Sequence, residues 1–224
     1  MDKTNSKQRS GKQRFLILGI FFFLFFILFS FLVHLGLFSQ IDLKITLKLQ
    51  AVISRIFDIP FSILSLLGSV EVVTLILLVI VWFWKRLNAA YVLFSYGFLH
   101  LIELFGKYFI THSGPPFRYF RYDIPFIFPT SEIKPGFSYP SGHMARTAFL
   151  TAIIMILIDN SKFSRNQKIV CYFLLLVFNL AMFVSRIYLG EHWLSDVIGG
   201  ALLGLSLGLL SLFIFPGRIA FHKS

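Results

Sequence analysis

The chain has 224 residues, of which 57% are hydrophobic and 14% are charged, and its mean hydropathy is +0.79. Soluble domains carry about 25% charged residues, and the apolar residues here form long blocks, so the composition excludes an ordinary soluble domain and favours a membrane protein. The formal net charge of +11 does not indicate nucleic-acid binding, because the basic residues lie between apolar blocks and no motif combines them with stacking aromatic residues.

The first predicted element is an apolar block at residues 15–38, preceded by a basic segment at residues 1–14. A cleavable signal peptide has an apolar region of roughly 7–15 residues that ends at a small-residue cleavage site. The block at 15–38 is longer and has no such site. We therefore expect a retained transmembrane helix, with residues 1–14 as a basic cytoplasmic tail.

Five more apolar blocks follow along the chain. They cover residues 61–84, 89–110, 143–158, 169–188 and 195–215. A transmembrane helix needs roughly 17–25 residues, and the fourth of the six blocks is the shortest. The sequence therefore predicts an all-α, polytopic membrane protein with six transmembrane helices in one bundle and with residues 1–224 as a single domain.

Two connecting segments have their own predicted structure. Residues 39–60 mix leucine and isoleucine with charged residues, which is typical of an amphipathic helix at the membrane surface. Residues 111–141 form the longest connection and are rich in proline and aromatic residues. Loops of this length are often functional, so we expect an ordered loop that covers a site.

The distribution of basic residues predicts the orientation in the membrane. With the N-terminus inside, the cytoplasmic segments carry twelve lysines and arginines and the outer segments carry six. This count leaves out Lys107, Arg146 and Arg186, which lie close to predicted helix ends. Because cytoplasmic loops are enriched in lysine and arginine, we expect both termini inside and the segments 39–60 and 111–141 outside.

The fourth apolar block begins with the motif Pro140-Ser141-Gly142-His143. Proline suits the first turn of a helix, and a helix N-terminus offers free N–H groups to an anion. His143 would lie at the mouth of that anion site, where it could give or take a proton. Taken alone, the motif is equally compatible with a capped helix that has a histidine at the membrane interface.

A second motif, Ser185-Arg186 followed by His192 and Asp196, lies at the end of the fifth block and the start of the sixth. A carboxylate that binds one imidazole nitrogen raises the basicity of the other, which makes His192 a candidate nucleophile. Arg186 offers a planar fork that matches phosphate oxygens. Because both motifs fall on the same predicted side of the membrane, phosphoryl transfer is a better interpretation than a chance ion pair.

These motifs resemble the signature of the type-2 phosphatidic acid phosphatase superfamily, the membrane lipid phosphatases, which reads K-x6-R-P, P-S-G-H and S-R-x5-H-x3-D. The second and third parts are complete in this chain, and the six-helix layout is similar too. The first part is degenerate, because Lys107 is followed by Gly114-Pro115 where the family has Arg-Pro.

The resemblance implies a role for each matching residue. His192 would attack phosphorus and form a phosphohistidine, Asp196 would orient His192, and His143 would protonate the leaving oxygen. The implied phosphate-binding residues are Lys107, Ser141, Gly142 and Arg186. The family uses no metal or other cofactor, and a chain with a single cysteine, Cys171, cannot form a cysteine metal site.

Three arginines, Arg118, Arg121 and Arg146, are candidate replacements for the arginine that the degenerate first motif lacks, and we favour Arg146 or Arg118. Arg118 lies downstream in the same loop, and Arg146 lies three residues after His143. Charge-assisted hydrogen bonds to phosphate are among the strong ones, so the difference matters. The alternatives are a weaker hold on phosphate, a different head group or reduced activity.

Glu103 lies inside the third apolar block with His100 and Lys107 on the same predicted helix face. The simplest interpretation is a Glu103–Lys107 pair that orients the lysine; a proton relay and a contact with another helix are the alternatives. His112, between Lys107 and Gly114, is close enough in sequence to reach a lipid head group.

The sequence therefore predicts a metal-independent membrane phosphatase that hydrolyses a lipid phosphate or lipid diphosphate in the cell (inner) membrane. Its active site would face the periplasm or exterior, and its partners would be the lipid substrate and the bilayer, with the oligomeric state left open. The alternatives are a lipid phosphotransferase that uses the same site and a weakly active, lipid-binding member of the family.

Overall fold

The computed structural model describes residues 3–83, 89–129 and 136–213, in which the regular elements are α-helices and short 3-10 helices. The predicted ends of the second and sixth transmembrane helices, Trp84 and Phe215, lie outside these ranges. The same holds for five of the basic residues behind the predicted orientation: Lys85, Arg86, Lys134, Arg218 and Lys223.

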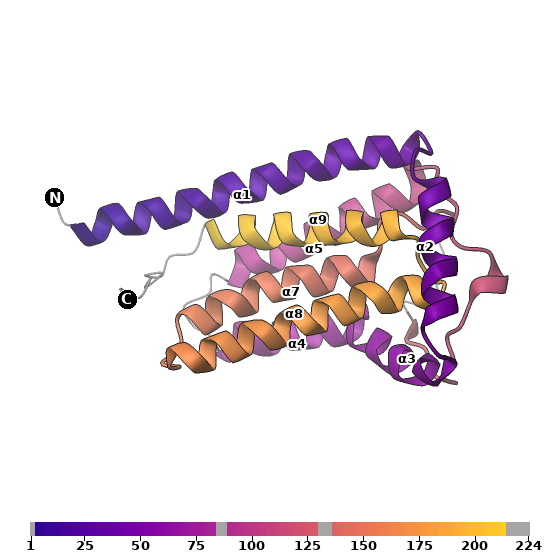
Figure 1. The fold of residues 1–224 in the computed structure, drawn as a ribbon. Helices are drawn as coiled ribbons and strands as arrows, with labels where there is room; N and C mark the ends of the chain where they lie inside the picture. The colour runs from indigo at the N-terminus through magenta and orange to yellow at the C-terminus, as the bar shows by residue number, and fades with distance from the viewer. Residues whose placement is uncertain (1–2, 84–88, 130–135, 214–224) are drawn as a thin grey trace.

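The long helices run side by side in a bundle, with α2 (Ser39–Val52) across one end, which we name the α2 end (Figure 1). Five described helices are long and apolar enough to cross a membrane, and α4 (Val70–Phe83) is a shorter apolar helix. The five are α1 (Lys3–His34, apolar from Gln13), α5 (Ala89–Phe109), α7 (Gly142–Asp159), α8 (Arg165–Tyr188) and α9 (Leu194–Phe213). The predicted all-helical, polytopic fold is confirmed.

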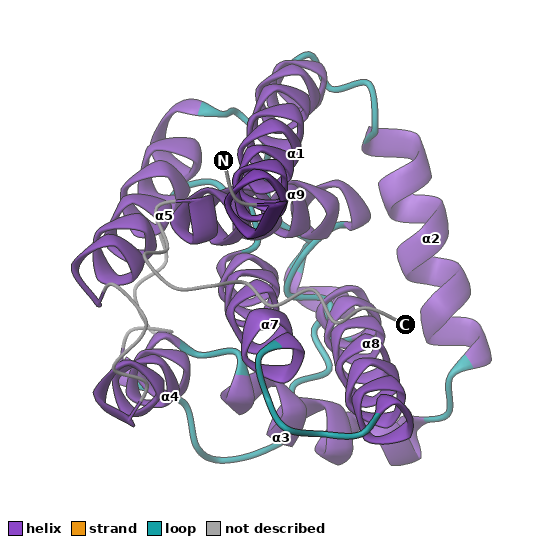
Figure 2. Cartoon of the chain, turned by 90° about the vertical axis from the view of Figure 1, so that its left-hand side faces the viewer, coloured by secondary structure: helices purple, strands orange, loops and turns teal. Residues whose placement is uncertain are grey.

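Helix α7 lies in the middle of the bundle, between α9, α8, α5 and α4 (Figure 2). Its contact with α9 depends on Gly200, Gly204 and Gly208, which are four residues apart on one face of α9. A side chain at any of them would overlap with α7, because its backbone or small side chains lie directly against these glycines. Small residues at this spacing let two membrane helices approach closely, and the close packing holds the first turns of α7 and α9 together.

The predicted second transmembrane helix, residues 61–84, is wrong as a single element. The chain forms α3 (Asp58–Leu67) and α4, with a break at Gly68 and Ser69. The Ser69 hydroxyl accepts a hydrogen bond from the backbone N–H of Val72 at 3.3 Å, which caps the new helix. The break leaves the carbonyl oxygen of Gly68 free to accept a hydrogen bond from the side chain of Arg146 on α7.

Apolar side chains cover the outside of the bundle, as Phe21 on α1 and Leu174 on α8 illustrate. A soluble monomer rarely exposes apolar surface on this scale. Helix α2 also exposes apolar side chains, since Leu43 and Leu47 are exposed whereas Asp42 and Thr46 are buried against the bundle. The predicted helix within residues 39–60 is therefore present, with Asp42 and Thr46 on the side that faces the bundle.

Candidate active site at the α2 end of the bundle

The Pro-Ser-Gly-His motif forms the start of α7. Ser141 is the N-cap residue, and its backbone N–H donates to the carbonyl oxygen of Asp196 at 2.9 Å, which ties the turn to α9. The hydroxyl of Ser141 is buried and has no hydrogen-bond partner among the described residues. A helix start of this kind offers N–H groups and a hydroxyl to a bound anion.

His192 and Asp196 form the histidine–carboxylate pair that their spacing predicts. Nδ1 of His192 lies 3.3 Å from Oδ2 of Asp196, which also accepts the backbone N–H of Trp193 at 2.9 Å. Burial lowers the pKa of His192 to about 4, against the opposing effect of the Asp196 hydrogen bond. Burial thus favours the neutral imidazole, and its contact with Asp196 is made through Nδ1 rather than Nε2.

Arg186 lies in the last turn of α8, fully buried, with its guanidinium group held from two sides. One nitrogen donates to the hydroxyl of Ser65 on α3, and another pairs with the carboxylate of Glu191. Its Nε is buried and has no hydrogen-bond partner among the described residues. Sequence reasoning missed both partners, although Glu191 is an acid inside the spacer of the second motif.

Glu103 is the centre of a second charged cluster. Its carboxylate lies 3.6 Å from Nζ of Lys107, 3.4 Å from Nδ1 of His100 and 3.0 Å from Nη1 of Arg146. The predicted Glu103–Lys107 pair is confirmed, and Glu103 also contacts another helix through Arg146. Nε of Arg146 donates to the carbonyl oxygen of Gly68 at 3.0 Å, so the break between α3 and α4 fixes this arginine.

Gly142 allows this cluster to form. A side chain at position 142 would overlap with the carboxylate of Glu103 and would come within 2.6 Å of Nη1 of Arg146. The glycine of the motif therefore leaves the space that the ends of the Glu103 and Arg146 side chains occupy beside the first turn of α7.

His143 lies between the two groups of residues. Its ring interacts electrostatically with the positive charges of Arg186, Arg146 and Lys107 and with the His192 imidazole. It also packs against the break between α3 and α4, since its Cδ2 lies 3.1 Å from the position that a side chain at Gly68 would occupy. The structure thus brings together, from α5, α7, α8 and the start of α9, nearly all the predicted site residues. They are Lys107, Ser141, Gly142, His143, Arg146, Arg186, His192 and Asp196.

Arg118 is not joined to this group in the contacts of the described residues. It lies in η2 (Phe117–Tyr119), with its guanidinium carbon 4.9 Å from the centre of the Tyr119 ring. Together with Arg55 and Arg121 it lines a polar pocket of about 290 Å³. Of the two favoured replacements for the arginine of the first motif, Arg146 is therefore the one that contacts the Glu103 cluster.

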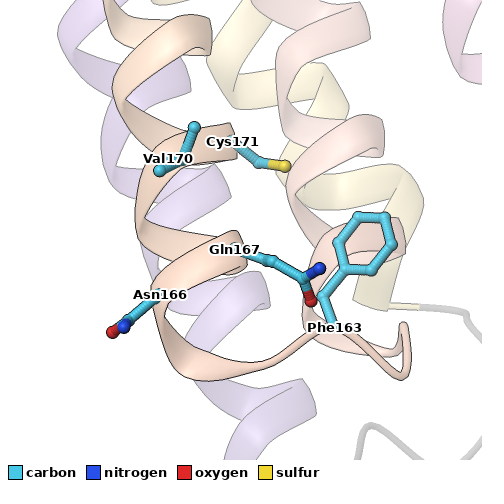
Figure 3. Close-up of a pocket in the computed structure, with 5 residues that line it drawn as sticks. All are labelled: Phe163, Asn166, Gln167, Val170 and Cys171. Carbon is cyan, nitrogen blue, oxygen red and sulfur yellow. The ribbon is translucent and has the colours of Figure 1, made fainter.

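A separate pocket of about 330 Å³ lies at the start of α8 (Figure 3), at the end of the bundle away from α2 (Figure 1). Phe163, Asn166, Gln167, Val170 and Cys171 line it. This lining has no ionisable group apart from the Cys171 thiol, so the pocket does not offer the acid, base and cations that phosphoryl transfer needs.

Comparison with known proteins identifies the family. The model of the PAP2 superfamily matches residues 88–220, which is more than half of the chain and contains both complete motifs. Phosphatidylglycerophosphatase B of Bacillus subtilis (strain 168) is 36% identical over 83 residues, a segment that covers 37% of this chain and 39% of that relative. The aligned part thus spans about two fifths of the curated relative's length.

Two solved structures have a similar fold. A transmembrane PAP2-type phosphatidylglycerolphosphate phosphatase from Bacillus subtilis superposes with a TM-score of 0.70 at 24% identity, over 86% of this chain and 93% of that one. LpxE from Aquifex aeolicus superposes with a TM-score of 0.52 at 20% identity, over 77% and 94%. Because the family model matches more than half of the chain, the chain belongs to the PAP2 superfamily.

Proposed function

We propose that this protein hydrolyses a lipid phosphate or lipid diphosphate through a phosphohistidine on His192. The observation that carries the proposal is the combination of a neutral, carboxylate-bound imidazole with two buried polar atoms, Ser141 Oγ and Arg186 Nε, that have no hydrogen-bond partner among the described residues. Buried polar groups are nearly always hydrogen-bonded. A phosphoryl group beside Nε2 of His192 would supply acceptors for both atoms.

The proposed reaction has two steps. In the first, Nε2 of His192 attacks phosphorus, the bond from phosphorus to the lipid oxygen breaks, and His143 gives a proton to that oxygen. In the second, His143 takes a proton from a water molecule that attacks the phosphohistidine, and the phosphorus–nitrogen bond breaks to release phosphate. Asp196 stabilises the imidazolium that forms at Nδ1 in both steps.

The cations around the site would bind the phosphoryl oxygens without a metal ion. Arg186 offers a guanidinium group whose Nε is free to donate, and Lys107 and Arg146 bring two further positive charges around the single carboxylate of Glu103. These cations would stabilise the negative charge on the phosphoryl oxygens in the transition state. Arg146 would take the role of the arginine that is replaced by Gly114.

The first substrate class to test is a glycerophospholipid with a terminal phosphate. Two of the similar proteins from Bacillus subtilis have names that describe phosphatases of phosphatidylglycerol phosphate. The excess of basic residues in the predicted cytoplasmic segments supports both termini inside and a site on the outer side of the cell membrane.

A phosphotransferase that passes the phosphoryl group to another lipid would use the same residues, with an alcohol in place of water in the second step. Gly114 favours a third candidate, a lipid-binding protein with little activity, because it removes one expected cation from the site. The contact of Arg146 with the Glu103 cluster weighs against this third candidate.

The proposal is tested with the purified full-length protein in detergent micelles and a panel of lipid phosphates and diphosphates. We expect phosphate release from at least one lipid by the wild-type protein and none above background by His192→Ala. Orthovanadate, which mimics the transferred phosphoryl group, should inhibit the reaction. Equal release by His192→Ala would contradict the proposal.

A further inference from the structure

Asp196 has a second set of neighbours that belongs to neither motif. Asp42 on α2 and Ser195 on α9 are both buried and form two hydrogen bonds. The backbone N–H of Ser195 donates to Oδ1 of Asp42 at 2.8 Å, and its hydroxyl donates to Oδ2 at 2.7 Å. The residue next to Asp196 is thus anchored to the helix that crosses the end of the bundle.

His112, in the loop after α5, completes this arrangement. Its Nε2 lies 3.1 Å from Oγ of Ser195 and 3.6 Å from an oxygen of each carboxylate, Asp42 and Asp196. Because the Ser195 hydroxyl gives its only hydrogen to Asp42, it accepts from His112, and Nε2 of His112 therefore carries a hydrogen. The hydrogen on Nε2 thus goes to Ser195, while Nε2 itself also lies close to both carboxylates.

The two oxygens of Asp196 face different histidines. Oδ2 accepts from the nucleophile side, where Nδ1 of His192 lies at 3.3 Å. Oδ1 is buried, accepts no hydrogen bond from the described residues, and has Nε2 of His112 at 3.6 Å. A buried carboxylate needs partners on both oxygens, and His112 is the group placed to serve the second.

The backbone around His112 is also held in place. Its carbonyl oxygen accepts the backbone N–H and the hydroxyl of Ser138, at 3.0 and 3.1 Å. Ser138 lies two residues before Pro140 in the motif that starts α7. The imidazole is therefore fixed relative to both the first turn of α7 and the first turn of α9.

We propose that His112, held by Ser195 and Asp42, is a positioning residue that orients the carboxylate of Asp196 toward the nucleophile. This inference rests on the proposed role of His192. The polar Nε2–H group of His112 lies 3.6 Å from Oδ1, and this electrostatic attraction favours the carboxylate orientation in which Oδ2 faces Nδ1 of His192. In this role His112 does not touch the lipid, and its loss affects turnover rather than substrate binding.

A purely structural contact between α2 and α9 would not need His112. Asp42 and Ser195 alone already join the two helices with two hydrogen bonds, and neither of these bonds requires a histidine next to Asp196. Placing an imidazole N–H between two buried carboxylates is useful where the orientation of one of them matters.

The experiment compares His112→Ala, His112→Gln and Asp42→Asn in the full-length protein, with dioctanoyl phosphatidic acid as the probe. Glutamine keeps an N–H donor near the position of Nε2. The matched control is His34→Gln, because His34 contacts Thr111, the neighbour of His112, but does not face Asp196. His192→Ala serves as the blank, and elution volume and thermal denaturation in detergent report folding.

We expect His112→Ala and Asp42→Asn to lower kcat about 10- to 100-fold, the size of effect seen when partners behind a ligating histidine are removed, with KM changed by less than about 3-fold. His112→Gln should recover most of the lost kcat, and His34→Gln should match the wild type. If His112→Ala does not fold, Asp42→Asn, which keeps the size of the side chain, decides the question.

The proposal is overturned if kcat of the folded variants stays within about 2-fold of the wild type, or if KM rises while kcat is unchanged, because His112 would then contact the lipid. An equal loss in His34→Gln would overturn it too. These results differ from a failure of the proposed function, in which the wild-type protein would release no more phosphate than His192→Ala.

Discussion

Two carboxylates, Glu103 and Asp196, lie at the same end of the bundle but have opposite surroundings. Glu103 contacts the cations Lys107 and Arg146, whereas Asp196 contacts imidazole rings and a backbone N–H group. The same chemical group thus has two different kinds of partner. Glu103 is surrounded by more positive charge than it neutralises, whereas Asp196 lies within 3.6 Å of two imidazole rings.

The positions of the two carboxylates in the chain explain the difference. Glu103 lies within a predicted membrane-spanning helix, where an acid needs cationic partners from its own or a neighbouring helix. Asp196 lies in the first turn of α9, where the helix dipole and the N–H group of Trp193 already stabilise a negative charge. Its remaining hydrogen-bonding capacity is therefore available to histidines.

The largest loss of activity is expected from a change at Asp196. We expect Asp196→Asn to lower kcat by roughly 10³- to 10⁴-fold, as in other histidine–carboxylate pairs, because the amide no longer stabilises the imidazolium of His192. Steady-state phosphate release measures the effect, with KM as the check on substrate binding. A decrease below about 10-fold would mean that Asp196 is a structural residue.

Removal of a cation from the Glu103 side should have a smaller effect. Arg146→Ala should lower kcat/KM about 10- to 100-fold, the equivalent of one charge-assisted hydrogen bond to phosphate. Arg118→Ala is the control, since it lies over Tyr119 and should change kcat/KM less than about 3-fold. Unchanged turnover in the double variant would contradict the idea that either arginine replaces the missing one.

The contact between Glu103 and α7 can be tested without a change of charge. Gly142→Ala should lower the free energy of unfolding by about 1–3 kcal/mol and displace the Glu103 cluster, because the new methyl group overlaps with the carboxylate. Gly97→Ala on α5 is the matched control, since its methyl group would meet open space. Thermal denaturation in detergent should show a lower midpoint only for the first variant.

The pH dependence of kcat/KM tests the protonation state of His192, the partner of Asp196. Because burial lowers the pKa of His192 to about 4, the nucleophile stays neutral well below pH 6 and becomes protonated only as the pH falls through about 4. The acid limb of kcat/KM against pH, which reports groups of the free enzyme, should have its midpoint near pH 4. A midpoint near 6.5, the ordinary value for histidine, would contradict a buried, neutral nucleophile.

The sequence predicts the parts of the site that depend on local spacing. His192 and Asp196 are four residues apart, as are Glu103 and Lys107, and both pairs meet in the structure. The long apolar blocks likewise predict helices that carry both motifs to one end. These features follow from helix periodicity and from the length of a membrane span.

Contacts between distant segments could not be predicted in this way. The carbonyl of Gly68 and the hydroxyl of Ser65 reach Arg146 and Arg186 only because the second apolar block breaks, and the apolar pattern of residues 61–84 hides that break.

His112 and Asp42 are 70 residues apart in sequence and meet only through tertiary packing. The choice between Arg146 and Arg118 likewise depended on which one the packing of α5 against α7 brings to Glu103.

The central claim, that His192 carries the phosphoryl group, is tested most directly by trapping the intermediate. Wild-type protein, mixed with a ³²P-labelled lipid phosphate and quenched in base within the first turnover, should retain label in a bond that is stable in base and labile in acid. His192→Ala should retain none, and Asp196→Asn should retain it only after a longer reaction time. Label on His192→Ala, or label that survives acid, would contradict the claim.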